Sequence, residues 1–163
     1  MESKYLRYKV IAKEDTHCLS EIMMNSEHMR FSTQFSSISE CESYIGPLAN
    51  QWENLGFGCW TIVEKISNEV IGWGGIVLDE SDPDWGPELI YYISPKKCGN
   101  GYASEVSEFS CNYAFSVANI PKVAAFAHPE NYASNKVIRK TGFQFVRYLK
   151  AMNRNYYELA AST

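Results

Sequence analysis

The stretch Glu88-Leu-Ile-Tyr-Tyr-Ile-Ser94, which runs on into Pro95-Lys-Lys-Cys-Gly-Asn-Gly-Tyr-Ala-Ser104, decides how this chain folds. Its first half is rich in β-branched and aromatic residues and ends at turn formers, as strands do. Its second half is a glycine-punctuated loop that leads into a segment, 101–118, with apolar residues at helical spacing. The first turn of a helix leaves backbone N–H groups unpaired at the positive end of the helix dipole. The sequence therefore predicts a strand, a loop and a helix that together bind an anion such as phosphate.

Three kinds of phosphate-binding loop compete for this segment. The Walker loop requires Gly-x-x-x-x-Gly-Lys-Ser/Thr, which does not occur in the chain. The dinucleotide fingerprint requires a third glycine where Ser104 stands, and the acidic residue expected about twenty positions further on is also absent. The third kind, Gln/Arg-x-x-Gly-x-Gly/Ala, binds the pyrophosphate of coenzyme A. Here it reads Cys98-Gly-Asn-Gly-Tyr-Ala103.

Around this unit the chain alternates short strand-like and helix-like segments in the order β-α-α-β-β-β-α-β-α-β-β. The order predicts one domain, residues 1–163, of the α/β (α+β) class, with a central, mixed, largely antiparallel twisted sheet flanked by helices. Strands are predicted at 4–12, 57–64, 70–78, 88–94, 123–127, 143–149 and 154–160, the last two as a hairpin, and helices after Asp15, from Ser39, over 101–118 and over 132–141.

The helix predicted from Ser39 carries two local signals. Ser39 and Glu42 have the spacing of a capping box, which opens a helix. Gly46-Pro47 predicts a kink or a split, because proline lacks the helical N–H and clashes with the preceding turn.

Composition and charge narrow the class of protein. With 163 residues, of which 45% are hydrophobic, the chain can bury one sizeable core. Its net charge of −4 argues against a nucleic-acid partner, which would require a basic surface. No apolar run approaches the ~18–20 residues that cross a bilayer, so no membrane partner is predicted. The five cysteines and three histidines show no metal-ligand spacing, so we expect no metal, reduced thiols and a cytoplasmic location.

Three motifs stand in register along the chain: Ile71-Gly72 with Gly74-Gly75-Ile76, then Gly99-Asn-Gly-Tyr-Ala-Ser-Glu105, then Asn131-Tyr-Ala-Ser134 before Gly142-Phe143. They resemble the GNAT superfamily of N-acetyltransferases, in particular its ribosomal-protein-alanine acetyltransferase-like branch. That branch typically carries an Ile-Gly-x-x-Gly strand, Gly-x-Gly-Tyr-Ala-Thr-Glu, and Asn-x-x-Ser followed by Gly-Phe. The likeness runs from about residue 5 to 160, and the order of elements agrees with it.

The resemblance implies that acetyl-CoA is the cosubstrate. It implies that backbone groups of Tyr91 and Ile93 pair with the pantetheine arm like an added strand, and that Asn131 hydrogen-bonds the same arm. The sequence departs from the family pattern at Cys98, because a thiol stands there in place of the usual Gln or Arg. Lys96 and Lys97 either supply the missing positive charge or are ordinary solvated lysines. The backbone amides that would hold the pyrophosphate belong to Cys98, Gly99, Asn100, Gly101, Tyr102, Ala103 and Ser104.

Direct acetyl transfer needs a neutral amine, yet an amine of pKa ~10.4 is only about one part in 10³ neutral near pH 7. A proton acceptor is therefore required beside the amine. The first hypothesis is Glu88, which opens the strand that would hold the acetyl group; a Glu there resembles related enzymes, although it also fits an edge carboxylate paired with a lysine. The rival is His128, three residues before Asn131, which also fits a structural histidine.

The leaving thiolate needs a polar partner as well. Many members of the superfamily use a tyrosine four residues after the Ser134 position, but Ile138 stands there. The resemblance places Ser134 near the thioester, so the proton is expected from Ser134, Tyr132 or water. Glu105, in the first turn of its helix, is expected to be structural because the helix dipole favours a carboxylate there.

The acceptor is expected to be a primary amine, on either a protein N-terminus or a small molecule. In this family the segment 27–38 and the loop 79–87 form the acceptor side of the cleft, and an acidic loop suits a cationic acceptor. A homodimer is compatible with this fold. The alternative function is a non-catalytic acyl-CoA-binding or regulatory module, which the missing tyrosine keeps open. The acidic residues of the loop are Asp79, Glu80, Asp82 and Asp84.

Overall fold

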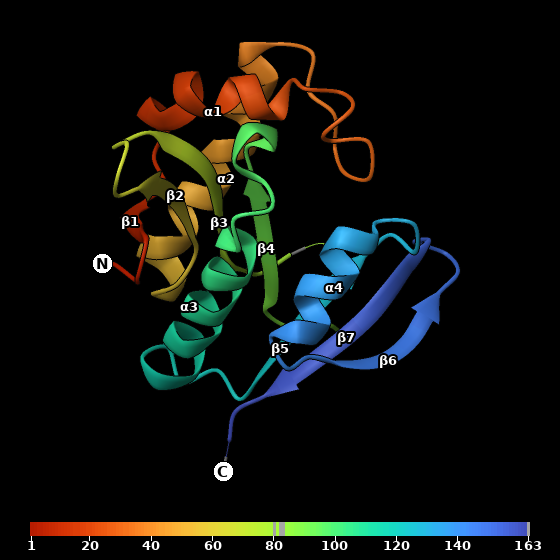
Figure 1. Ribbon diagram of the computed structural model, residues 1–163. Helices are drawn as coiled ribbons and strands as arrows, with labels where there is room; N and C mark the ends of the chain where they lie inside the picture. The colour runs from red at the N-terminus through yellow and green to blue at the C-terminus, as the bar shows by residue number, and fades with distance from the viewer. Residues whose placement is uncertain (80, 82–83, 163) are drawn as a thin grey trace.

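A single sheet, with strands in the order β1-β2-β3-β4-β5-β7-β6, runs through the computed structural model, which describes residues 1–79, 81 and 84–162 (Figure 1). Neighbouring strands pair antiparallel, except for β4 and β5, which run parallel. The mixed, largely antiparallel sheet predicted from the sequence is therefore confirmed. The strands are β1 (Leu6–Val10), β2 (Cys59–Glu64), β3 (Val70–Val77), β4 (Glu88–Ile93), β5 (Lys122–Ala127), β6 (Gln144–Leu149) and β7 (Arg154–Ala160).

The helices follow the predicted order, with two short 3-10 turns added. Gly142, which follows the fourth helix, has a φ of 96°, the left-handed conformation that is typical of a glycine at the end of a helix. Within the described residues, no helix has both the length and the apolar character that crossing a membrane requires. The helical elements are η1 (Lys13–Asp15), α1 (Thr16–Met23), α2 (Ile38–Leu55), η2 (Pro95–Lys97), α3 (Tyr102–Ser116) and α4 (Tyr132–Lys140).

The start of α2 differs from the prediction. Its N-cap is Ser37 instead of Ser39, because the Ser37 Oγ accepts the backbone N–H of Glu40 at 3.2 Å. The Glu40 carboxylate in turn accepts the backbone N–H of Ser36 at 2.8 Å. A serine and a glutamate therefore do cap this helix, but two residues earlier than the Ser39–Glu42 pair.

The continuity of α2 also differs from the prediction. The helix extends unbroken through Pro47, so the predicted split does not occur. Its two halves are anchored in the core before and after the proline, and this burial outweighs the loss of one backbone hydrogen bond. The buried side chains that anchor it are Cys41, Ile45 and Leu48.

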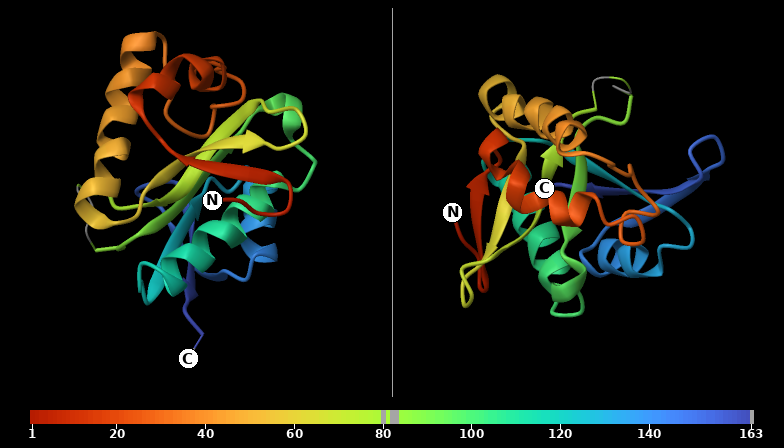
Figure 2. Two further views of the ribbon diagram at one scale, coloured as in Figure 1. Left: turned by 90° about the vertical axis from the view of Figure 1, so that its left-hand side faces the viewer. Right: turned by 90° about the horizontal axis from the view of Figure 1, so that it is seen from above.

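The helices cover the sheet in pairs. The view from above shows α1 and α2 on one face and α3 and α4 on the other (Figure 2). Side chains of β4 alternate between these layers. Ile90 and Tyr92 pack on the side of α1 and α2, whereas Leu89, Tyr91 and Ile93 pack on the side of α3.

The sheet opens in its middle. β4 and β5 pair only at Glu88–Ala124 and Leu89–Ala125, although the two strands continue to Ile93 and Ala127. β4 stays paired with β3 along its whole length, so β5 is the strand that turns away, and Figure 1 shows the two diverging. The opening lies at the C-terminal ends of two parallel strands, where α/β folds commonly bind ligands.

Candidate active site

A cavity of about 950 Å³ lies where β4 and β5 diverge. One end is formed by the glycine loop, the first turn of α3 and one side of α4. The other end is formed by the segment 28–33, the loop before β4 and the start of β7. Of the thirteen site residues predicted from the sequence, all but Asn100 line this cavity.

The exposed edge of β4 supplies the middle of the cavity. The backbone N–H of Ser94 donates to the carbonyl of Ile71, on β3, at 2.7 Å. This bond identifies the residues of β4 whose backbone groups point toward β3. Because backbone groups alternate along an antiparallel strand, those of Tyr91 and Ile93 point the other way, toward β5. β5 has already turned away at that level. These groups therefore face the cavity as an edge to which an extended ligand can add like a strand.

The glycine loop presents its backbone to the same cavity. Gly99 and Gly101 have φ values of 85° and 82°, and Gly101 is the N-cap of α3 without a side-chain cap. This conformation requires glycine because other residues adopt it only with strain. The neighbouring side chains turn back onto the chain: the Cys98 Sγ lies 3.4 Å from the Ser94 carbonyl, and the Asn100 amide donates to the Lys97 carbonyl at 3.0 Å. The side chain of Asn100 thus shapes the loop from outside the cavity.

The two loop lysines are held by carboxylates. The Lys97 Nζ lies 2.6 Å from a Glu64 oxygen and 3.0 Å from a Glu69 oxygen, and these contacts raise the lysine pKa. The Lys96 Nζ lies 2.8 Å from Glu21 on the surface. Glu64 is almost completely buried, so the charge of Lys97 is balanced inside the protein.

Glu88 lies at the junction of the two diverging strands, where it is half-buried and lines the cavity. It shares a face of β4 with Tyr92, whose hydroxyl lies 3.2 Å from the Ser32 Oγ. Burial raises the pKa of Tyr92, and the negative charge of Glu88 raises it further. Glu88 therefore belongs to the end of the cavity that the segment 28–33 covers.

Both ring nitrogens of His128 are engaged. Its Nδ1 accepts the backbone N–H of Glu130 at 3.1 Å, and its Nε2 lies 2.8 Å from the Asn153 amide nitrogen. The ring also stacks on Phe31 at 4.8 Å between centroids. As a base, His128 would first have to break one of these contacts.

Ser134 and Asn131 lie at the start of α4. The Asn131 Oδ1 accepts the backbone N–H of Ser134 at 3.2 Å and so caps the helix. The Ser134 Oγ lies 3.0 Å from the Tyr91 Oη, and burial raises the pKa of that phenol to about 12. Tyr132, by contrast, is 78% exposed and outside the cavity lining, and Ile138 is buried.

Some residues of the site were missed by sequence reasoning. The Tyr91 hydroxyl could have been found from the alternation of side chains along β4, which turns odd-numbered residues toward α3 and α4. His28 and Arg154 also line the cavity, and no sequence motif marks them. The pKa of His28 is lowered, mainly by burial. Arg154 donates to the Phe31 carbonyl at 2.6 Å, which ties β7 to the segment 28–33.

The structure describes part of the acceptor side that was predicted from the sequence. Four aromatic rings line that end of the cavity together with the Asp79 carboxylate. Asp84 is exposed and lies outside the lining, whereas Glu80 and Asp82 lie outside the described residues. Glu105 has the structural role expected for it, because its carboxylate accepts the backbone N–H of Tyr5 at 2.7 Å. The aromatic residues are Phe31, Trp85, Tyr92 and Phe126.

The fold and the strand-edge cavity identify the class. The chain matches the family model for the acetyltransferase (GNAT) domain over residues 6–144, and it belongs to this family. YoaA, an uncharacterized N-acetyltransferase of Bacillus subtilis (strain 168), is 27% identical over 146 residues, 88% of this chain and 82% of YoaA. YkkB, an uncharacterized protein of the same organism, is 30% identical over 107 residues, 64% of this chain. That match spans 62% of YkkB, less than two thirds of its length.

Solved structures share the fold. An acetyltransferase from Agrobacterium tumefaciens str. C58 has a TM-score of 0.86 at 19% identity, covering 99% of this chain and 94% of that one. The ribosomal-protein-S5-alanine acetyltransferase from Vibrio fischeri has a TM-score of 0.79 at 15% identity, covering 98% and 95%. The microcin C7 self-immunity acetyltransferase MccE, solved with acetyl-CoA and AMP, has a TM-score of 0.76 at 15% identity, covering 98% and 94%. The predicted GNAT-like architecture is confirmed.

Proposed function

We propose that this protein is an acetyl-CoA-dependent N-acetyltransferase that transfers an acetyl group directly to a primary amine. The observation that carries the proposal is the cavity between β4 and β5, which joins a free strand edge to a glycine loop at a helix N-terminus. Membership of the GNAT family and the acetyl-CoA bound by MccE support acetyl-CoA as the cosubstrate.

The residues present fit that cosubstrate. The amides of residues 98–104 would hold the pyrophosphate, because the left-handed glycines leave the backbone of the loop open on the cavity side. The free backbone groups of Tyr91 and Ile93 would pair with the pantetheine arm. Asn131 uses its oxygen to cap α4, which leaves its amide nitrogen to donate to the same arm. When bound, acetyl-CoA supplies an activated acetyl group as a thioester.

Glu88 is the residue that we assign as the base. It lines the acceptor end of the cavity on the same face of β4 as Tyr92, and an ionised carboxylate there both attracts a cationic amine and accepts its proton. An α-amino group, with a pKa near 8, requires less help than an alkyl amine with a pKa of ~10.4. His128 is the second choice, because both of its nitrogens are already bonded.

The hydroxyl pair of Tyr91 and Ser134 is assigned to the leaving sulfur. A phenol with a pKa of about 12 is a much weaker acid than a thiol with a pKa of ~8.5. Tyr91 and Ser134 therefore stabilise a developing thiolate by hydrogen bonds instead of protonating it. Water can then supply the proton, so the chemistry does not require a tyrosine at Ile138.

The proposed acceptor is a primary amine, on either a protein N-terminus or a small molecule. The aromatic rings and the Asp79 and Glu88 carboxylates at that end suit a cation, because aromatic faces and carboxylates both attract positive charge. The five cysteines are all free thiols, which supports a location in the reducing cytoplasm.

The test is acetyl-CoA turnover with a panel of basic peptides and small amines, read as release of free thiol. An enzyme releases thiol only when a suitable amine is present, and mass spectrometry then finds the amine 42 Da heavier, the mass that replacement of a hydrogen by an acetyl group adds. Tight binding of acetyl-CoA without turnover across the whole panel would overturn the proposal and favour the non-catalytic acyl-CoA-binding module.

A further inference from the structure

The cations that line the cavity differ in whether a partner within the protein already binds them. Coenzyme A carries a pyrophosphate and a ribose 3′-phosphate, whereas this chain has a net charge of −4 and a thiol, Cys98, at the loop position where the family pattern has Gln or Arg. The described residues that line the cavity include four cations. Two of them are already used: Lys97 is balanced by Glu64 and Glu69, and Arg154 binds the Phe31 carbonyl at the other end.

The two remaining cations are Lys136 and Lys140. They stand four residues apart on α4, so their side chains leave the helix on one face. Both are exposed, and both line the cavity. Within the described part of the chain, neither forms an ion pair with a carboxylate. Their charge is therefore available to a ligand.

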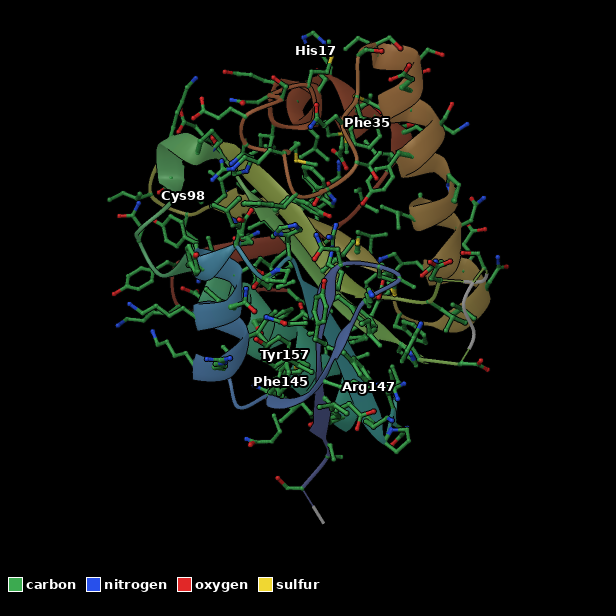
Figure 3. All side chains as sticks on the ribbon, turned by 90° about the vertical axis from the view of Figure 1, so that its right-hand side faces the viewer. His17, Phe35, Cys98, Phe145, Arg147 and Tyr157 are labelled. Carbon is green, nitrogen blue, oxygen red and sulfur yellow. The ribbon has the colours of Figure 1, made fainter. Side chains whose placement is uncertain are left out.

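The packing of α4 places these lysines beside the phosphate loop. The Thr141 Oγ1, directly after α4, lies 2.9 Å from the Ser107 Oγ in the second turn of α3. The last turn of α4 is thus fixed next to the first turns of α3, where Tyr102, Ala103 and Ser104 line the same cavity. Figure 3 shows the loop that bears Cys98 and helix α4 on the same side of the molecule.

We propose that Lys136 and Lys140 form the cationic site for the 3′-phosphate of coenzyme A. This proposal rests on the proposed function, because it assumes that the glycine loop takes the pyrophosphate. The loop amides supply hydrogen bonds and the partial charge of a helix end, but no full positive charge. The lysines supply that charge from the opposite wall and compensate for the thiol at Cys98. The site would make the protein selective for coenzyme A over dephospho-coenzyme A.

The experiment is calorimetric titration of the folded protein with coenzyme A and with dephospho-coenzyme A. For the Lys136→Gln/Lys140→Gln double variant we expect coenzyme A to bind about tenfold more weakly, and dephospho-coenzyme A to change less than about twofold. The difference should shrink at high salt, because exposed charges are screened. A Lys136→Arg/Lys140→Arg variant should retain the affinity of the wild type.

The matched control is Arg139→Gln. Arg139 lies on the same helix and is equally exposed, but its guanidinium lies over the Tyr157 ring at 5.8 Å, outside the cavity lining. It should leave both affinities unchanged. Equal losses for the two ligands in the double variant, or no loss at all, would overturn the lysine site while the wild type still binds coenzyme A. A wild type that binds neither ligand would overturn the proposed function itself.

Discussion

The Tyr91 Oη lies 3.0 Å from the Ser134 Oγ, so a side chain of β4 contacts the first turn of α4 across the cavity. The pair occupies the wall where the leaving sulfur of the proposed reaction would lie. It provides two hydroxyl donors at a place where Ile138 can provide none. The contact therefore carries a direct prediction about the rate of the chemical step.

Tyr91→Phe should lower kcat about tenfold and change the KM for acetyl-CoA less than about twofold, because one hydrogen bond to the developing thiolate is lost. Ser134→Ala should lower kcat by a similar factor, and the double variant should lower kcat by less than the product of the two factors. The control is Tyr113→Phe, whose hydroxyl donates to the Gly56 carbonyl at 3.1 Å outside the cavity lining. A Tyr91→Phe variant that raises KM alone would show that the hydroxyl positions the cosubstrate only.

Glu88→Gln should lower kcat/KM by about 10²–10³ near pH 7, because the amine would lose its proton acceptor. Part of the loss should return at high pH, where more of the amine is already neutral. Initial rates of thiol release between pH ~6.5 and ~9.5 measure both effects. Glu108→Gln, an exposed carboxylate on α3, serves as the control.

His128→Ala should cost less than about fivefold in the same assay, since both ring nitrogens are engaged within the protein. A loss for His128→Ala greater than that for Glu88→Gln would transfer the role of the base to the histidine.

The order of strands and helices could be predicted because it depends on local patterns: apolar periodicity, turn formers and a glycine after α4. The start of α2 could not. Ser37 and Ser39 each stand three residues before a glutamate, Glu40 and Glu42, so both have the spacing of a cap. Which serine caps the helix depends on which face buries Cys41 and Ile45, and only the packed core decides that.

The candidate site likewise has a part that the sequence predicts and a part that it does not. The glycine loop and the strand edge follow from the sequence around residues 88–104, because backbone groups form both. The side chains that complete the site are placed by distant partners. Lys97 reaches Glu64, 33 positions earlier, and Tyr91 meets Ser134, 43 positions later. Such pairings depend on how the helices pack on the sheet, which the sequence pattern alone does not specify.

Gly101→Ala should weaken the binding of coenzyme A by roughly tenfold or more, because a methyl group would project toward the phosphates from a backbone with a φ of 82°. The left-handed conformation also costs about 1–2 kcal/mol of stability for a residue with a Cβ. Gly56→Ala is the matched control, since Gly56 ends α2 with a φ of 74° and has equally open surroundings. It should lower Tm to a similar extent and leave the calorimetric Kd unchanged. Equal Kd values for the two variants would argue against the loop as the phosphate site.

Glu64→Gln should destabilise the protein at neutral pH and flatten its acid denaturation. The buried Glu64 carboxylate accepts hydrogen bonds from Lys97, Ser67 and Tyr102, which lower its pKa from 4.5 to about 2. A pKa that is lower in the folded state contributes stability above pH 4.5, and this contribution is lost as the pH falls toward 2. The wild type should therefore lose Tm more steeply than Glu64→Gln across that interval, as followed by circular dichroism. Glu69→Gln removes the more exposed partner of Lys97 and should leave the slope close to that of the wild type; an unchanged slope in Glu64→Gln would show that this network does not govern acid stability.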